Sequence, residues 1–87
     1  MRKLTMFIQK TCPYCKQAMQ WQKELMDENE RYRNIEIDII DEREQPELAE
    51  SYDYYYVPTY FASKEKLHEG AASKEKIRAV LDAALEG

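Results

Sequence analysis

The chain has 87 residues, enough for one small domain with a single core, and we expect that domain to span residues 1–87. Hydrophobic residues make up 44% and aromatic residues 11%, which excludes a disordered chain. The net charge of -4 argues against a nucleic-acid-binding surface, and no apolar run approaches the ~18 residues of a membrane span. The N-terminal residues lack the apolar stretch of a signal peptide, so we expect a cytoplasmic protein.

The first half of the chain predicts a strand, a helix and a second strand. In residues 4–8, Leu4, Met6 and Ile8 alternate with Thr5 and Phe7, and since even Phe7 is apolar we expect both faces of this strand to be covered. Pro13 suits the first position of the helix that follows, where its missing N–H costs nothing. The apolar face of that helix comprises Cys15, Ala18, Met19, Trp21, Gln22, Leu25 and Met26. The second strand comprises Ile35, Ile37 and Ile39, with Glu36 and an exposed Asp38 between them.

The second half predicts a helix, two strands and a final helix. Residues 41–44 form an acidic run that we interpret as a solvated loop leading to a short helix at Pro46. Two short strands at residues 59–61 and 67–68 flank a charged turn, and Ser73 caps the last helix. Residues predicted to face inward are Leu48, Ala49 and Tyr52 around the short helix, and Ile77, Val80, Leu81, Ala84 and Leu85 in the last one.

The resulting order, βαβαββα, predicts an α/β fold. A strand–helix–strand start implies a right-handed crossover and a parallel pair, whereas the closing hairpin is antiparallel. We therefore expect a four-stranded mixed sheet with helices on both faces.

The cysteine pair Cys12 and Cys15 calls for a chemical explanation. Closing so short a loop with a disulfide removes about 2 kcal/mol of unfolded-chain entropy at most, so a disulfide here would stabilise the fold only slightly. Cys12 lies at a helix N-terminus, where unpaired N–H groups favour a thiolate, and Cys15 lies one turn further along the same face. This arrangement predicts thiol–disulfide exchange, in which Cys12 attacks a disulfide and Cys15 resolves the mixed disulfide.

Other groups must help to lower the pKa of Cys12, because a helix terminus supplies only part of the free energy required. We expect the backbone N–H and the thiol of Cys15 to contribute, with Lys10 or Lys16 nearby. A structural zinc site needs four ligands, and His68 is the only other good candidate, so we predict no metal and assign His68 no role.

Over nearly its whole length the chain resembles the glutaredoxin branch of the thioredoxin family. Residues 12–15, Cys-Pro-Tyr-Cys, are identical to the dithiol glutaredoxin motif, and residues 56–58, Tyr-Val-Pro, stand where that family has Thr-Val-Pro before a strand. The resemblance implies the thioredoxin fold and a cis peptide bond between Val57 and Pro58. It also implies that the main chain of Val57 pairs with the cysteine of the substrate, which Tyr14 and Tyr56 would flank.

The resemblance further implies a dithiol oxidoreductase without a bound cofactor, reduced by glutathione and acting on disulfide-containing proteins as a monomer. The glutathione-binding residues depart from the family pattern. Gln9 replaces a common lysine, with Lys10 next to it, and Gly70 and Ser73 stand where the family has two glycines and then two aspartates. These changes also suit a hydrogen donor reduced by thioredoxin reductase, such as those that supply ribonucleotide reductase.

A hypothesis of another class is a redox-silent protein-binding module that uses a tyrosine-rich face. The tyrosines concerned are Tyr52, Tyr54, Tyr55 and Tyr56. They could instead be ordinary strand-forming residues with half-buried rings, an interpretation that we favour for Tyr52 and leave open for Tyr55 and Tyr56.

Overall fold

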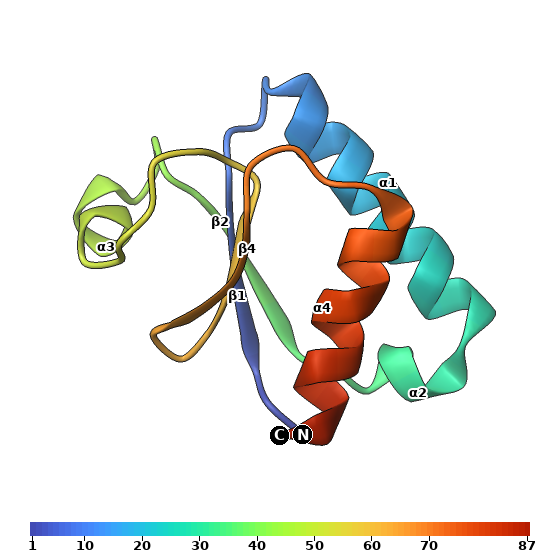
Figure 1. Cartoon of the computed structure of the whole chain (residues 1–87). Coiled ribbons are helices and arrows are strands. Elements are labelled where there is room, and N and C mark those ends of the chain that lie inside the picture. Colours follow the sequence, from blue (N-terminus) through green and yellow to red (C-terminus); the bar gives the residue numbers. More distant parts are fainter.

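Four strands form a mixed sheet in the order β2-β1-β3-β4, and the computed structural model describes all residues, 1–87 (Figure 1). β1 pairs in parallel with β2 and antiparallel with β3, which is antiparallel to β4. α1 and α4 cover one face and α3 lies on the other, so the predicted layers are confirmed. The elements are β1 (Leu4–Ile8), α1 (Pro13–Glu28), α2 (Glu30–Arg33), β2 (Ile37–Asp41), α3 (Pro46–Glu50), β3 (Thr59–Ala62), β4 (Glu65–Glu69) and α4 (Lys74–Glu86).

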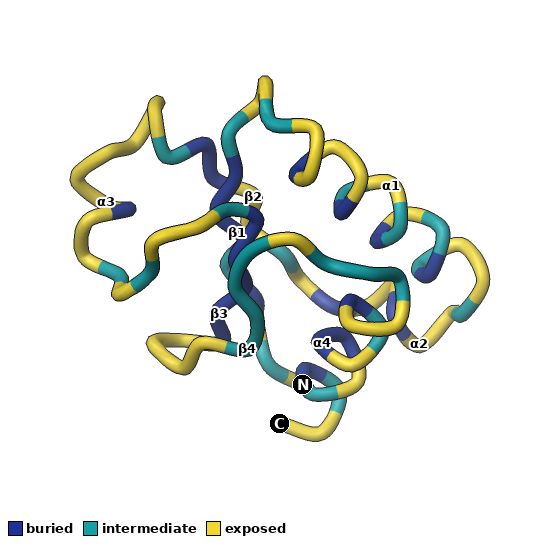
Figure 2. The backbone as a smooth tube through the Cα atoms, turned by 45° about the horizontal axis from the view of Figure 1, so that its top comes forward, coloured by how far each residue is buried: buried dark blue, intermediate teal, exposed yellow.

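The sheet separates a large apolar cluster from a small one. In Figure 2 the buried residues lie along the strands and recur at intervals along α1. The large cluster fills the space between the sheet and the two long helices, and Leu4, Met6, Ile77 and Leu81 are fully buried in it. The small cluster lies on the face of α3 and contains Phe7, Ile40, Ala49 and Phe61. Because β1 is central and Phe7 is fully buried, the prediction that both faces of this strand are covered is confirmed.

The region between α1 and β2 differs from the predicted order. A short helix, α2, follows Asn29, whose side-chain oxygen accepts a hydrogen bond from the N–H of Arg31. The helix places Tyr32 in the core, where its hydroxyl donates to Asp82 at 2.6 Å. The second strand therefore begins at Ile37, and Ile35 is buried ahead of it.

Two apolar residues of the predicted elements are exposed, and for Leu48 the prediction that it faces inward is wrong. Ile39 lies on the α1 side of β2, an edge strand, where it lines a hollow with Met19, whereas its neighbour Ile40 enters the small cluster on the α3 side. Leu48 is also exposed, because a helix of five residues presents only Ala49 to the sheet. Tyr52 follows that helix and packs edge-on against Phe7 at 4.8 Å between ring centroids, as an inward-facing residue should.

The predicted helix N-termini and the predicted exposure of Asp38 agree with the structure. Pro13 and Pro46 lie in the first turns of α1 and α3, and the hydroxyl of Ser73 accepts from the N–H of Lys76 at 3.1 Å. Asp38 is exposed and pairs with Lys3 at 3.0 Å. No helix in the structure has both the length and the apolar character to cross a membrane.

Candidate active site

The sheet topology gathers the predicted site residues at one edge of the sheet. The parallel strands β1 and β2 both end there, and β3, which is antiparallel to them, begins there. Phe7 pairs with Thr59, so the loop from β1 to Cys12 runs beside the segment that contains Val57 and Pro58. Gly70 joins them, since its N–H donates to the Pro58 carbonyl at 2.8 Å.

Cys12 is the N-cap of α1 and is partly exposed. Its extended backbone conformation lets its carbonyl accept the first helical hydrogen bonds, from the N–H groups of Cys15 and Lys16 at 3.1 Å each. Its own N–H donates to the carbonyl of Gln9 at 2.9 Å, which closes the loop after β1. The sulfur therefore projects from a fixed point at the positive end of a 16-residue helix.

The two thiols have opposite pKa shifts. Burial acts to raise the pKa of Cys12, but hydrogen bonds from the backbone N–H and thiol of Cys15 and from the N–H of Tyr14 outweigh it, so the pKa is lowered. Burial raises the pKa of Cys15, and the N–H of Gln9, 3.5 Å from its sulfur, offsets only part of this effect. Both cysteines are free. At neutral pH the exposed sulfur is thus the better nucleophile and the buried one holds its proton.

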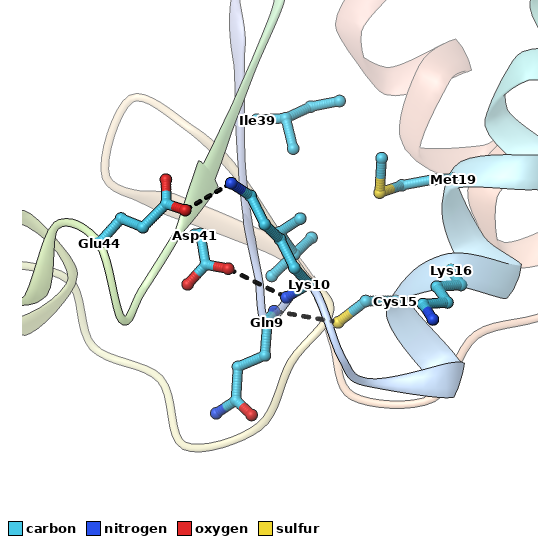
Figure 3. A pocket seen from close by; sticks show the side chains of 9 residues that line it. Gln9, Lys10, Cys15, Lys16, Met19, Ile39, Asp41 and Glu44 are labelled. Atoms are coloured by element: carbon cyan, nitrogen blue, oxygen red, sulfur yellow. Dashed lines mark hydrogen bonds and ion pairs between the residues drawn. The ribbon is translucent and has the colours of Figure 1, made fainter.

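A hollow of about 350 Å³ lies against Cys15, between α1 and the ends of β1 and β2 (Figure 3). The side chain of Lys10 runs along it toward Glu44, with which it forms an ion pair, and not toward the sulfur. Lys16 also points away from Cys15 (Figure 3). The groups that lower the pKa of Cys12 are the backbone N–H and thiol of Cys15 and the N–H of Tyr14, and neither lysine is among them. The expectation that Lys10 or Lys16 helps to stabilise this thiolate is therefore not met.

The acidic run at residues 41–44 is only in part the solvated loop that we predicted, because Arg43 and Glu44 are exposed but Asp41 is not. Asp41 is buried at the end of β2, where its carboxylate accepts from the N–H groups of Lys10 at 3.0 Å and Arg43 at 2.8 Å. Burial acts to raise its pKa, but these N–H groups prevail and hold the pKa below its usual value. Asp41 thereby ties the end of β2 to the loop that leads to Cys12.

Arg43 and Glu42 are site residues that sequence reasoning missed. The guanidinium of Arg43 donates to the side-chain oxygen of Gln9 at 3.0 Å and to the hydroxyl of Thr11 at 3.4 Å. The carboxylate of Glu42 accepts from the Tyr54 hydroxyl at 2.7 Å and from the side-chain amide of Gln9. A signal was available, because parallel neighbouring strands end at the same sheet edge and so bring the residues after β2 beside those after β1.

The remaining predicted residues lie in α1, in the segment before β3 and in the segment between β4 and α4. Tyr14 and Tyr56 are exposed, Val57 is half-buried and Pro58 is buried, with a cis bond between the last two as predicted. Gly70 has a φ of 88°, which other residue types rarely adopt. The hydroxyl of Ser73, predicted for glutathione, is already engaged as the cap of α4.

Comparisons with known proteins agree with this architecture. A family model described as a thioredoxin-like domain matches residues 1–85. A mutant of the thioredoxin-like protein BC3987 has 23% identity and a TM-score of 0.62, and the alignment covers 91% of this chain and 99% of that chain. A malarial protein has 19% identity and a TM-score of 0.70, with 94% of each chain covered. No curated protein matches the sequence. These likenesses establish the thioredoxin-like fold, and the chain belongs to the family of thioredoxin-like domains.

Proposed function

We propose that this protein is a glutaredoxin-like thiol–disulfide oxidoreductase that reduces protein disulfides or glutathione mixed disulfides. The observation that carries the proposal is the contrast between the two thiols. Cys12 is partly exposed with a lowered pKa at the start of α1, whereas Cys15 is buried with a raised pKa one turn away. A nucleophile that ionises at a lower pH and a second thiol that keeps its proton suit the two steps of disulfide exchange.

In the first step, the thiolate of Cys12 attacks one sulfur of the substrate disulfide. The other substrate sulfur leaves as a thiolate and takes up a proton, and a mixed disulfide with Cys12 remains. Cys15 then loses its proton and attacks the sulfur of Cys12, which releases the second substrate thiol and leaves a disulfide between Cys12 and Cys15. Two molecules of a thiol reductant such as glutathione return the two electrons and become a disulfide themselves.

Val57 has free main-chain groups with which to position the substrate. Its N–H and carbonyl form no hydrogen bond within the chain, although its neighbour Pro58 is bonded to Gly70. An extended substrate segment could therefore pair with Val57 beside Cys12, in the manner of an added strand. Tyr14 and Tyr56 would flank that segment.

Arg43 could bind glutathione in place of the lysine that the family commonly has at the position of Gln9, because its guanidinium lies against the Gln9 side chain. Lys10 is already paired with Glu44, whereas Arg43 forms no ion pair and contacts Gln9 and Thr11 beside the cysteine motif. Its guanidinium would bind a glutathione carboxylate. Gly70 and the free N–H groups that begin α4 would receive the other end of the tripeptide.

The test is NADPH-coupled reduction of the neutral disulfide of 2-mercaptoethanol. One reaction contains glutathione and glutathione reductase, and a parallel reaction contains thioredoxin reductase. We expect turnover that depends on glutathione. Turnover with thioredoxin reductase alone would favour the hydrogen-donor alternative, which the replacement of the family lysine by Gln9 and of the aspartates near Ser73 supports. No turnover in either reaction would contradict the proposal and leave the redox-silent binding module.

A further inference from the structure

The four clustered tyrosines form two pairs. Two of them pack their rings against the small apolar cluster, and the other two have exposed rings. Tyr54 stacks on Phe7 with ring centroids 5.0 Å apart, and Tyr52 packs edge-on against Phe7 as well, so both belong to the small apolar cluster. Tyr55 and Tyr56 are instead 85% and 70% exposed. Tyr14, inside the cysteine motif, is 58% exposed. The chain thus leaves three large rings exposed, one in the cysteine motif and two just before Val57.

The two exposed tyrosines stand on a backbone that is held in place. One carboxylate oxygen of Glu69 accepts from the N–H groups of both Tyr55 and Tyr56, at 2.6 and 2.9 Å. Lys66 binds the other oxygen at 2.6 Å, and together these donors lower the pKa of Glu69 to about 2. The clamp therefore stays ionised at neutral pH. Exposed aromatic side chains on a fixed backbone have the character of a binding surface, since little backbone entropy is lost when a partner arrives.

The charges beside Tyr55 indicate what kind of partner fits. A hollow of about 260 Å³ is lined by Tyr55, the inner rings Tyr52 and Tyr54, and the carboxylates Glu42 and Glu50. Neither carboxylate forms an ion pair with a cation of the chain. Gln9 connects this hollow to the nucleophile, because its side-chain amide donates to Glu42 and its carbonyl accepts from the N–H of Cys12 at 2.9 Å.

Aromatic rings and carboxylates that no cation neutralises are together the chemistry that binds a guanidinium or ammonium group. The chain already provides one example, because the ammonium group of Lys64 sits 3.7 Å from the centroid of the Tyr52 ring. An anionic partner would meet the opposite conditions, with Glu42, Glu50 and the thiolate of Cys12 all repelling it.

We infer that the hollow beside Tyr55 binds a basic side chain of the substrate, so that the protein acts preferentially on protein disulfides flanked by arginine or lysine. This inference rests on the proposed function and specifies its substrate class. Tyr55 supplies the aromatic face, Glu42 and Glu50 supply the negative charge, and Glu69 keeps the tyrosine backbone in position.

The test uses pre-reduced protein and three pentapeptides that differ in one residue next to a central cysteine: arginine, its neutral analogue citrulline, or glutamate. Each cysteine is linked to 2-thiopyridine. The thiolate of Cys12 attacks the peptide sulfur and expels 2-thiopyridone, whose absorbance gives the second-order rate constant. We expect the arginine peptide to react about three- to tenfold faster than the citrulline peptide, and the glutamate peptide to be slowest. Added salt should reduce this ratio.

Two variants and a matched control locate the effect. Glu50→Gln removes one charge from the hollow, and Tyr55→Leu removes the aromatic face while keeping apolar bulk, so each should lower the arginine-to-citrulline ratio about threefold. Glu47→Gln removes the same charge from the same helix but outside the hollow, and it should leave the ratio unchanged.

The outcomes separate this inference from the proposed function. A ratio near one in the wild-type protein, with rapid reaction of all three peptides, would overturn the inference alone. A ratio that Glu50→Gln and Tyr55→Leu leave unaltered would also overturn it, because the selectivity would then arise elsewhere. Failure to react with any peptide or with the disulfide of 2-mercaptoethanol would overturn the proposed function and the inference together.

Discussion

The two thiols of the motif differ in acidity because one is surrounded by donors and the other by apolar groups. Since the pKa of Cys12 is lowered, its thiolate should persist at pH values below the ordinary ~8.5 of a free thiol. We expect the alkylation rate of Cys12 with iodoacetamide, followed by mass spectrometry, to reach half its maximum below that pH. Cys15→Ala removes one donor and should move this midpoint upward. A wild-type midpoint at the free-thiol value would contradict the assignment of Cys12 as nucleophile.

The division of labour between the sulfurs has its own test. Cys12→Ser should abolish all exchange, because the hydroxyl of serine is not ionised at neutral pH. Cys15→Ser should halt the reduction of protein disulfides but spare the removal of glutathione from a mixed disulfide, since glutathione can supply the second thiol. Coupled assays with a glutathionylated peptide and with a protein disulfide measure the two activities. Equal loss of both in Cys15→Ser would contradict the proposed roles.

A buried hydrogen bond connects the helix that carries the cysteines to the sheet. The hydroxyl of Tyr60 on β3 donates to the side-chain oxygen of Gln22 on α1 at 2.9 Å, and both side chains are buried. Tyr60→Phe leaves that oxygen without a donor and should lower the free energy of unfolding by about 1–3 kcal/mol, measured by urea denaturation. Tyr14→Phe, at an exposed position, is the control and should leave stability unchanged. Similar losses in both variants would argue against a role for the buried bond.

The last helix depends on its cap. Ser73→Ala removes the acceptor for the N–H of Lys76 at the start of α4 and should reduce the free energy of unfolding by about 0.5–2 kcal/mol. Ser73→Asp keeps an acceptor there and adds a negative charge at the positive helix end, so it should restore the stability. Thermal or urea denaturation compares the three proteins. If aspartate were no better than alanine, the cap would not be the source of the effect.

The free energy of unfolding of the whole molecule is expected to be small. By the usual range of about 0.05–0.15 kcal/mol per residue, a chain of this length unfolds at a cost of roughly 4–13 kcal/mol. Leu81 is 0% exposed at the centre of the large apolar cluster, so Leu81→Ala should cost about 2–5 kcal/mol and leave a marginal fold. Leu48→Ala, at a helical leucine that is 37% exposed, should cost far less by the same urea titration. A comparable cost at both positions would contradict the placement of Leu81 inside the core and of Leu48 outside it.

Local patterns in the sequence were enough to predict most of the architecture. Alternation at residues 4–8, the proline at position 13 and the serine at position 73 act within one strand or one helical turn, so the strand and both long helices could be located without knowledge of the fold. The position of Cys12 at the start of a helix, and hence its predicted acidity, follows from the same short-range rules.

Other features depend on residues far apart in the chain and could not be read from local patterns. Ile39 is exposed because β2 has no neighbour on its outer side, and Asp41 is buried because β1 ends next to it. Arg43 reaches Gln9 and Thr11 across more than 30 positions for the same reason, although the residues around it read as a solvated acidic loop. The sequence thus determines where strands and helices form, whereas the order and direction of the strands determine which side chains meet at the cysteine pair, because hydrogen bonding and burial depend on contacts between distant segments.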